Sequence, residues 1–497
     1  MKINLAKMSA RLRRIQLIVS AIMLQGTLAF AINWDGGGGA NTDIALGANW
    51  AGDVAPGSGT FGYFNLNSGS FYTVSSTNAY SIGGVLIATD KVNFDFTGNT
   101  VTVTGGADFT IGYIGATGQV KLLGGTLAAS AIRVGGDNSG GNGSLTVDNA
   151  TMTSSNRLNL GNGSGITGNL TVQNGGQVTA SSNGVNLALG GTASIVVSGT
   201  GSSLIAAGIV TSTGSQASTS NISVSNGALL STGGSFYASQ STNANTHIAV
   251  QNSGSLSISS HLGLGGTNGA VGGTASLSIT DGSSVSTGLD TKVWGGGVLN
   301  LSNSVLTSRY VTLGNNTVGQ AGATLVGSGT IKSTSAGNIT EIGGIFKPGD
   351  TYTTGGGVVA AIGTLVIGKS GTNMNLQLDS VATTTFDFNS ASSFDQVIVF
   401  GNFTVGGVLN LNMNFDPWNG GAGTSFTLFD ISGSHTGSFS SVNLTSGYDL
   451  VSAGFVGNDY IINAIPEPSS AATLSLGLFS LVLLSRFRRR KKIEDPV

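Results

Sequence analysis

The chain has 497 residues, of which 81 are Gly, 8% are charged and none is Cys. The absence of Cys excludes disulfides, thiolate metal ligands and thiol nucleophiles, and a hydrophobic content of 39% is too high for a disordered chain. The net charge of −2 hides basic clusters at both ends of the chain. Between residues 32 and 485 the net charge is −11, which repels phosphate backbones, so we expect no nucleic-acid partner.

The first predicted element is a secretory signal peptide, residues 1–31. A basic N-terminal region precedes an apolar run from Ile15 to Leu24, and Ala29 and Ala31 supply the small residues before a cleavage site. We therefore expect export by the Sec machinery, with cleavage after Ala31. An uncleaved anchor helix is the alternative, which the short apolar run and the Ala-x-Ala site disfavour.

The next segment, residues 32–79, differs in composition from the middle of the chain. It contains Trp34 and Trp50, two of the four Trp in the chain, together with the run Gly36–Gly39. We expect an N-terminal cap, because aromatic side chains can cover the open end of a stack of repeats. The alternative is an aromatic platform for sugars, with Trp34 and Trp50 as the candidate contact residues.

A short phrase recurs through the middle of the chain. It places two apolar residues two positions apart and then a turn such as Asn-Gly or Asp-Gly. Its second apolar residue falls at Val147, Val172, Val197, Val224, Val250, Ile279 and Leu301. The steps between these positions are 25, 25, 27, 26, 29 and 22 residues, and a regular period of this length is typical of a solenoid.

The phrase also indicates the kind of solenoid. Apolar residues two apart share one face of a strand, and Asn, Asp and Gly accept the positive φ of a tight turn. A second apolar strand residue follows each turn, for example Val178, Leu229, Leu256 and Val285. We predict an all-β chain whose residues 80–380 form a right-handed parallel β-helix with about three strands per coil. Antiparallel sandwiches are the alternative, which the even period disfavours.

The predicted β-helix has a definite size and two ends. About twelve coils over residues 80–380, each one strand spacing above the last, would rise roughly 58 Å. Residues 381–464 show alternating apolar residues and predict terminal coils with a β-rich C-terminal cap. Short helices are expected only at the signal peptide and at the C-terminal anchor.

The two flanks of the repeats resemble a known class of protein. The Trp34-Asp-Gly-Gly-Gly opening is similar to the start of many autotransporter β-helix passengers. The stretch Gly343-Gly-Ile-Phe-Lys-Pro-Gly349, with the later Phe394-Asp-Gln-Val-Ile-Val399, is similar to their ends. The resemblance covers most of residues 34–445 and implies a β-helix carried outside the cell.

The tail, residues 465–492, resembles the PEP-CTERM sorting signal of Gram-negative bacteria. It contains the tripeptide Pro466, Glu467 and Pro468, then an apolar run, then a basic cluster with Arg486, Arg488, Arg489 and Arg490. This resemblance implies recognition by an exosortase-type membrane protease or transpeptidase in cells that make exopolysaccharide. It also implies processing near Pro466–Pro468 and delivery to the cell surface or extracellular matrix.

A transmembrane segment is expected at about residues 469–485. The apolar core, residues 471–484, spans only about 21 Å as a helix, against a hydrocarbon core of about 30 Å. The basic cluster after it would stay cytoplasmic and leave the β-helix outside. The chain would thus be an inner-membrane intermediate before processing. An ordinary permanent anchor is the alternative.

Chemical motifs are sparse in this sequence. The three His, at 247, 261 and 435, lack metal-ligand spacing and are expected to be exposed turn residues, although His247 and His261 could approach across adjacent coils. Asp281, Asp290 and Lys292 could lie on neighbouring turns, but two carboxylates without aromatic subsites are weak evidence for glycoside chemistry. We expect no catalytic residues, cofactor or metal.

Two functions remain open from the sequence. The first is a non-catalytic structural or adhesive protein of the surface or matrix, associated with exopolysaccharide. The second is a carbohydrate-binding or carbohydrate-active β-helix protein, resembling lyases or hydrolases, that uses Trp34, Trp50, Trp294 or Trp418. A smooth polar rod favours the first function, and a face lined by acids and aromatic residues favours the second.

Overall fold

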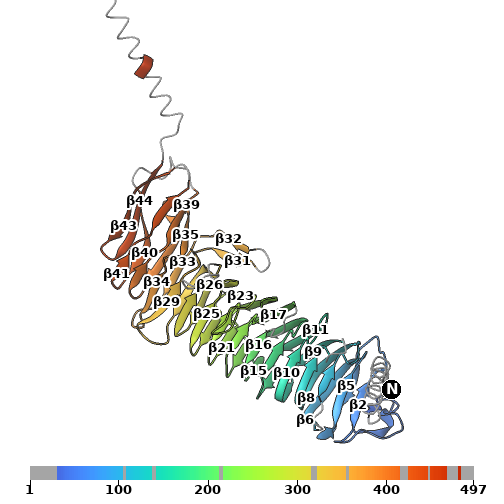
Figure 1. Ribbon diagram of the computed structural model, residues 1–497. Helices are drawn as coiled ribbons and strands as arrows, with labels where there is room; N and C mark the ends of the chain where they lie inside the picture. Colours follow the sequence, from blue (N-terminus) through green and yellow to red (C-terminus); the bar gives the residue numbers. More distant parts are fainter. Residues whose placement is uncertain are drawn as a thin grey trace, which may run out of the picture.

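The computed structural model describes residues 31–104, 108–136, 141–211, 217–314, 322–353, 357–414, 424–445, 448–466 and 480–482. The chain is a β-solenoid of about 14 turns, with 62% strand and 2% helix. Figure 1 shows the coils stacked into one elongated rod, from β2 near the N-terminal end to β43 and β44 near the C-terminal end. The predicted all-β fold of stacked parallel coils is confirmed.

Each coil supplies strands to three parallel columns, and the outward surface of each column is a face of the rod. Column 1, whose outward surface we call face 1, contains β3 (Tyr72–Ser75), β6 (Lys91–Val103), β8 (Thr117–Val134), β9 (Asn142–Asp148), β11 (Thr167–Gln173), β14 (Thr192–Ser198), β17 (Ser218–Ser225), β20 (Ala244–Gln251), β23 (Thr274–Thr280), β26 (Gly297–Thr307), β28 (Thr324–Lys332), β30 (Ile345–Pro348), β35 (Thr383–Ser390), β39 (Val408–Met413) and β42 (Ser441–Leu444).

Column 2 follows column 1 after a corner, and the long strands β6, β8, β26 and β28 run through that corner. Its other members are β4 (Tyr80–Ile82), β10 (Thr151–Leu160), β12 (Gln177–Ala180), β15 (Ser203–Ala206), β18 (Leu229–Thr232), β21 (Ser255–Ile258), β24 (Ser284–Thr287), β33 (Thr364–Ile367), β37 (Gln396–Val399) and β40 (Thr424–Ile431).

Column 3 closes each coil, and its outward surface is face 3. Besides the ends of β8 and β10, it contains β1 (Ala31–Asn33), β2 (Phe61–Phe64), β5 (Gly84–Ile87), β7 (Phe109–Ile111), β13 (Val185–Leu187), β16 (Ile209–Thr211), β19 (Phe236–Ala238), β22 (Leu262–Leu264), β25 (Asp290–Val293), β27 (Tyr310–Leu313), β29 (Asn338–Ile342), β34 (Met374–Leu378), β38 (Phe403–Val405) and β41 (His435–Gly437).

The predicted repeat positions stack directly on one another in column 1. Val172 pairs with Val147 on one side and with Val197 on the other, and the series continues in register through Val224, Val250, Ile279 and Leu301. The corner after these residues has the predicted turn. Asn174 and Gly175 have φ of 54° and 82°, and Asp281 and Gly282 have φ of 55° and 73°. The sequence period is therefore the coil period.

Leu229, predicted as an apolar strand residue after the turn, lies in β18 but does not point into the core. Leu230, and not Leu229, stacks between Leu204 and Leu256. Leu230 is fully buried, whereas Leu229 is 36% exposed. The alternation of a strand allows only one of two neighbouring Leu to point inward.

The core changes character along the rod. The middle coils are filled by Leu, Val and Ile, whereas both ends are filled by aromatic side chains. At the N-terminal end, Trp34 lies against Trp50 and Phe64, and a short 3-10 helix, η1 (Gly47–Asn49), leads into Trp50. At the C-terminal end, Phe386 and Phe403 both lie against Phe429. The bulky rings fill the terminal coils of the stack.

The first described strand of the parallel stack is β1, which lies at the start of the segment predicted as an N-terminal cap. At the other end, β44 (Asp459–Pro466) runs antiparallel to β40 and pairs with β43 (Tyr448–Val456), which turns the last coils into a small antiparallel sheet. The short strand β36 (Ser393–Phe394) pairs antiparallel with β35. Residues 480–482 are helical.

A β-hairpin leaves the rod between β30 and β33. Its strands, β31 (Thr351–Thr353) and β32 (Gly357–Val359), pair antiparallel and form a sheet of their own. Figure 1 shows the hairpin projecting beside β23 and β26, and β31 lies against β26 and β28. The hairpin therefore overhangs face 1.

Candidate functional site

Face 1 carries no charge over six successive coils. The strands β11, β14, β17, β20, β23 and β26 contain no Asp, Glu, Lys or Arg. Their outward residues are mostly Ser, Thr and Asn, and one line of register runs Ser194, Asn221, His247, Ser276 and Val298. The hydrogen-bonding side chains of this surface are therefore neutral.

The hairpin and face 1 enclose a hollow of about 360 Å³. We call it the hairpin groove, and it is lined by Asn245, His247, Thr274, Ala275, Ser276, Gly296, Val298, Tyr352 and Gly357. The floor comes from β20, β23 and β26, and Tyr352 of β31 and Gly357 of β32 form the wall. A shallower hollow of about 170 Å³ extends along face 1 from His247 to Ser194.

His247 lies where the two hollows meet. Its Nδ1 is 2.9 Å from the hydroxyl of Ser276, and its Nε2 is 3.1 Å from Nδ2 of Asn245. Because an amide nitrogen donates, Nε2 accepts and Nδ1 carries the proton toward Ser276. Burial lowers the pKa of His247, so the imidazole is neutral at pH 7. His247 is thus held in the floor of the groove and is not an exposed turn residue.

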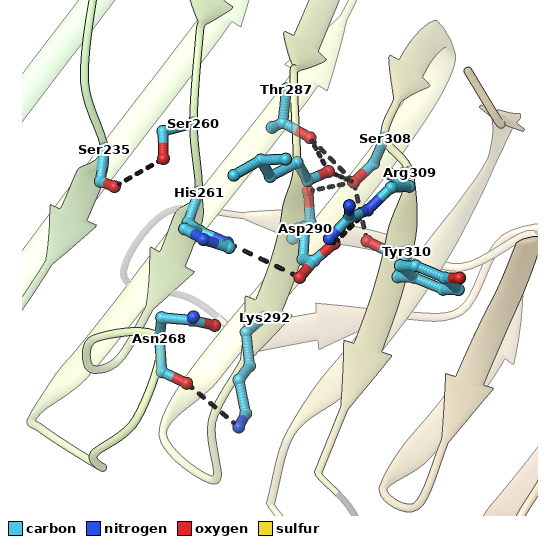
Figure 2. A network of polar contacts seen from close by, with 12 residues as sticks. Ser235, Ser260, His261, Asn268, Thr287, Asp290, Lys292, Ser308, Arg309 and Tyr310 are labelled. Atoms are coloured by element: carbon cyan, nitrogen blue, oxygen red, sulfur yellow. Dashed lines mark hydrogen bonds and ion pairs between the residues drawn. The ribbon is translucent and has the colours of Figure 1, made fainter. Parts of the chain in front are cut away.

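Face 3 carries the charged residues that face 1 lacks. Figure 2 shows His261 and Arg309 approaching Asp290 from opposite sides. Arg309 donates from Nε and Nη2 to Asp290 Oδ1 at 3.1 and 3.0 Å, and His261 Nδ1 is 3.7 Å from Asp290 Oδ2. Three successive coils are linked by these contacts. His261 and His247 belong to the same coil but lie on different faces, so they do not form a pair.

The aromatic residues near this network are engaged in packing. Lys292 Nζ lies 4.1 Å from the centroid of the Trp294 ring, and Trp294 Nε1 donates to Thr267 O at 2.6 Å. Trp294 is buried. Asp281 lies in the turn after β23, away from Asp290 in β25 on face 3, so the three residues proposed from the sequence are not brought into one site. The charged side chains of Asp290, His261 and Arg309 contact one another, and these contacts link neighbouring coils.

Three buried carboxylates form a separate cluster under the base of the hairpin. Asp350, Asp387 and Asp395 have carboxylate oxygens within 4.8 Å of one another. Asp395 accepts from Gly363 N and Asp387 N at 3.0 and 2.8 Å, and Lys347 Nζ is 3.6 Å from Asp350 Oδ2. Burial is the main cause that raises the pKa of Asp395 to about 8 and that of Asp350 to about 6.

The donor set of this cluster suits a hard cation in principle, because carboxylate oxygens are the ligands that such ions prefer. At pH 7, however, the proton that Asp395 retains and the positive charge of Lys347 beside Asp350 offset part of the negative charge that would attract such an ion. Sequence reasoning missed the cluster, since its members are separated by up to 45 positions between Asp350 and Asp395. The local signal was an acid beside aromatic residues, in Phe386-Asp387-Phe388 and in Phe394-Asp395.

The two candidate sugar-contact residues lie inside the molecule. Trp34 is 3% exposed and Trp50 is fully buried, and their rings meet edge to face at 5.1 Å. Trp50 Nε1 donates to Ile44 O at 2.8 Å. Neither ring offers a face to a sugar, because both are core residues of the first coils.

The predicted sorting and cleavage residues lie mostly outside the described residues. Ala31 is the first residue of β1 and Pro466 is the last residue of β44. Outside the described residues lie Ala29, Trp418, Glu467, Pro468, Arg486, Arg488, Arg489 and Arg490. In the described part of the chain, no helix is long and apolar enough to span a membrane, and the span expected at about residues 469–485 lies outside it except for residues 480–482.

The fold places this chain among the β-solenoid proteins. No protein-family model matches the sequence, and no curated protein is similar to it. Its function must therefore be argued from its own residues.

Proposed function

We propose that this protein is an exported, non-catalytic rod of the cell surface or extracellular matrix, sorted by its C-terminal signal and associated with exopolysaccharide. One observation carries the proposal: the described strands of the coil stack lie between the two predicted signals, from β1 (Ala31–Asn33) to β44 (Asp459–Pro466). Cleavage after Ala31 and near Pro466–Pro468 would remove at most the end residues of these two strands.

The surface of the rod supports a structural role. Face 1 is uncharged over six coils, and face 3 uses its charged residues to bond one coil to the next, as in the contact of Arg309 with Asp290. In the described residues, the acids that have strongly raised pKa values are buried and paired, with Asp395 bonded to two backbone N–H groups. Such a surface fits a spacer or matrix component better than an enzyme.

The proposed route has three stages. The Sec machinery exports the chain, the apolar segment at about residues 469–485 halts it in the inner membrane, and an exosortase-type enzyme processes it near Pro466–Pro468. The resemblance of the tail to PEP-CTERM signals supports this route. So does the basic cluster at residues 486–492, which favours a cytoplasmic C-terminus before processing.

Fractionation with intact-mass analysis tests the proposal. In the native host we expect an extracellular or surface form that lacks residues 1–31 and the C-terminal basic cluster. Replacing Pro466, Glu467 and Pro468 together by Ala should leave the unprocessed chain in the inner membrane, whereas replacing Ser469 and Ser470 by Ala should not. An extracellular wild-type protein that still carries residues 486–492 would overturn the sorting proposal.

A carbohydrate-binding function is the second candidate. The hairpin groove favours it, because this hollow on face 1 is neutral and is lined by a partly exposed tyrosine, Tyr352.

A further inference from the structure

We propose that the hairpin groove binds a neutral polysaccharide chain that lies along face 1 of the solenoid. This inference deepens the proposed function, since it rests on an association with exopolysaccharide and names the surface and the class of polymer. The evidence lies in the shape of the groove, its charge and its hydrogen-bonding groups.

The shape suits a segment of a linear polymer. The groove has a volume of about 360 Å³, within the range of small-molecule sites, and continues into the shallower hollow of about 170 Å³ through His247. The line from Ser276 through His247 and Asn221 to Ser194 follows the rod axis, with one coil every 4.8 Å or so. A chain could therefore enter under the hairpin and continue over successive coils.

The charge of the surface selects against ionic polymers. No strand from β11 to β26 on face 1 contributes an ionisable side chain other than His247, and burial lowers the pKa of that residue. The described hairpin strands also carry no charge. A uronic-acid polymer would lose its hydration without gaining a cationic partner, and burying an unpaired charge is costly. A neutral sugar has no such cost.

The floor and wall provide what a neutral sugar requires. Hydroxyl and amide groups of Asn245, Thr274 and Ser276 line the floor, and Tyr352 gives an aromatic wall. Sugar hydroxyls can satisfy such groups, while the apolar face of a pyranose stacks on an aromatic ring.

An extended peptide is the less suitable occupant. Peptides that join a sheet do so at a free edge, and the strands of the floor have none, because β20 pairs with β17 and β23 while β23 pairs with β20 and β26. The floor exposes side chains and not backbone N–H groups.

Binding of the purified full-length chain in detergent to an array of neutral and uronic-acid oligosaccharides tests the inference. We expect binding to one or more neutral linear oligosaccharides and none to oligogalacturonate. Titration calorimetry with the best neutral probe should then show at least a tenfold loss of affinity for Thr274→Trp, which fills the groove from an exposed position. Tyr352→Ala should lose affinity and Tyr352→Phe should keep it.

Ser284→Trp is the matched control. Ser284 is the first residue of β24, as Thr274 is of β23, and both are exposed, but Ser284 lies on column 2. Binding only to uronic-acid probes, binding to no neutral probe, or an equal loss in the Thr274 and Ser284 variants would overturn the inference. The assay uses unprocessed protein, so failure of the sorting proposal would leave its result intact, and failure of binding would leave the sorting proposal intact.

Discussion

How much a side chain stabilises its coil depends on whether it stacks between core residues of the two neighbouring coils. Leu230 is fully buried between Leu204 and Leu256, whereas Leu229 beside it is 36% exposed. We expect Leu230→Ala to lower the free energy of unfolding by about 2–5 kcal/mol, because it leaves a cavity in a column of aliphatic residues. Leu229→Ala should cost less than about 1 kcal/mol. Urea denaturation of the two variants measures the difference, and equal losses would contradict the register of column 2.

The buried carboxylates give the molecule a pH dependence of defined sign. The pKa of Asp350 is raised to about 6 and that of Asp395 to about 8, above their values in an unfolded chain. The folded state therefore holds protons that the unfolded state releases, and stability falls as pH rises from about 4 to about 8. At pH 8 the loss from Asp350 alone is on the order of 3 kcal/mol.

Asp350→Asn tests this dependence at the same residue. An amide can accept from Ala361 N, as Asp350 Oδ1 does at 3.1 Å, and can donate to Asp387 without ionising. We expect a higher melting temperature than wild type at pH 8 and a smaller change in melting temperature between pH 5 and pH 8. Asp281→Asn, in an exposed turn at a φ that Asn accepts, should leave that change as it is in wild type. A variant of Asp350 with an unaltered pH profile would show that the cluster does not control stability.

At the scale of elements, the sequence repeat accounts for most of the strands and stacking that could be predicted. Residues that recur every 22 to 29 positions had to stack, and Val147 through Leu301 do so in register. The position of the turn also identifies which residue of column 2 points inward. That residue lies four positions after the turn Asn or Asp, as Val178 follows Asn174. The same count from Asn226 gives Leu230.

Elements that occur once could not be predicted in this way. The hairpin β31–β32 and the antiparallel strands β43 and β44 have no counterpart in the described parts of the other coils, so no repeat reveals them. The groove and the acid cluster both depend on the hairpin and its base. Their residues, such as His247 and Tyr352, are more than 100 positions apart in sequence and meet only because the hairpin folds back over β26. The charged contacts of face 3 could be predicted only in part, since Asp290 and Lys292 stood out in the sequence but Arg309, the partner of Asp290, lies one coil further on.

At the scale of the whole molecule, a solenoid with local contacts should tolerate the loss of a complete coil but not of a fraction of one. Deleting residues 147–171 removes one 25-residue repeat and joins Thr146 to Val172, which stacks directly on Val147 in the native rod. Every inward residue of the new coil then meets an inward residue below it. We expect a rod shortened by about 4.8 Å that still unfolds cooperatively.

Deleting residues 147–170, one residue fewer, is the matched control. It puts Thr171 at the inward position of Val147 and turns Val172 outward, because a slip of one residue moves a strand's side chains to the opposite face. We expect this variant to lose its cooperative urea transition and its sharp maximum dimension in small-angle X-ray scattering, while the 25-residue deletion keeps both. Similar behaviour of the two deletions would mean that the stacked register of column 1 does not hold the rod together. Because the two deletions differ by only one residue in length, a difference in their unfolding must come from the strand register and not from the length of the chain.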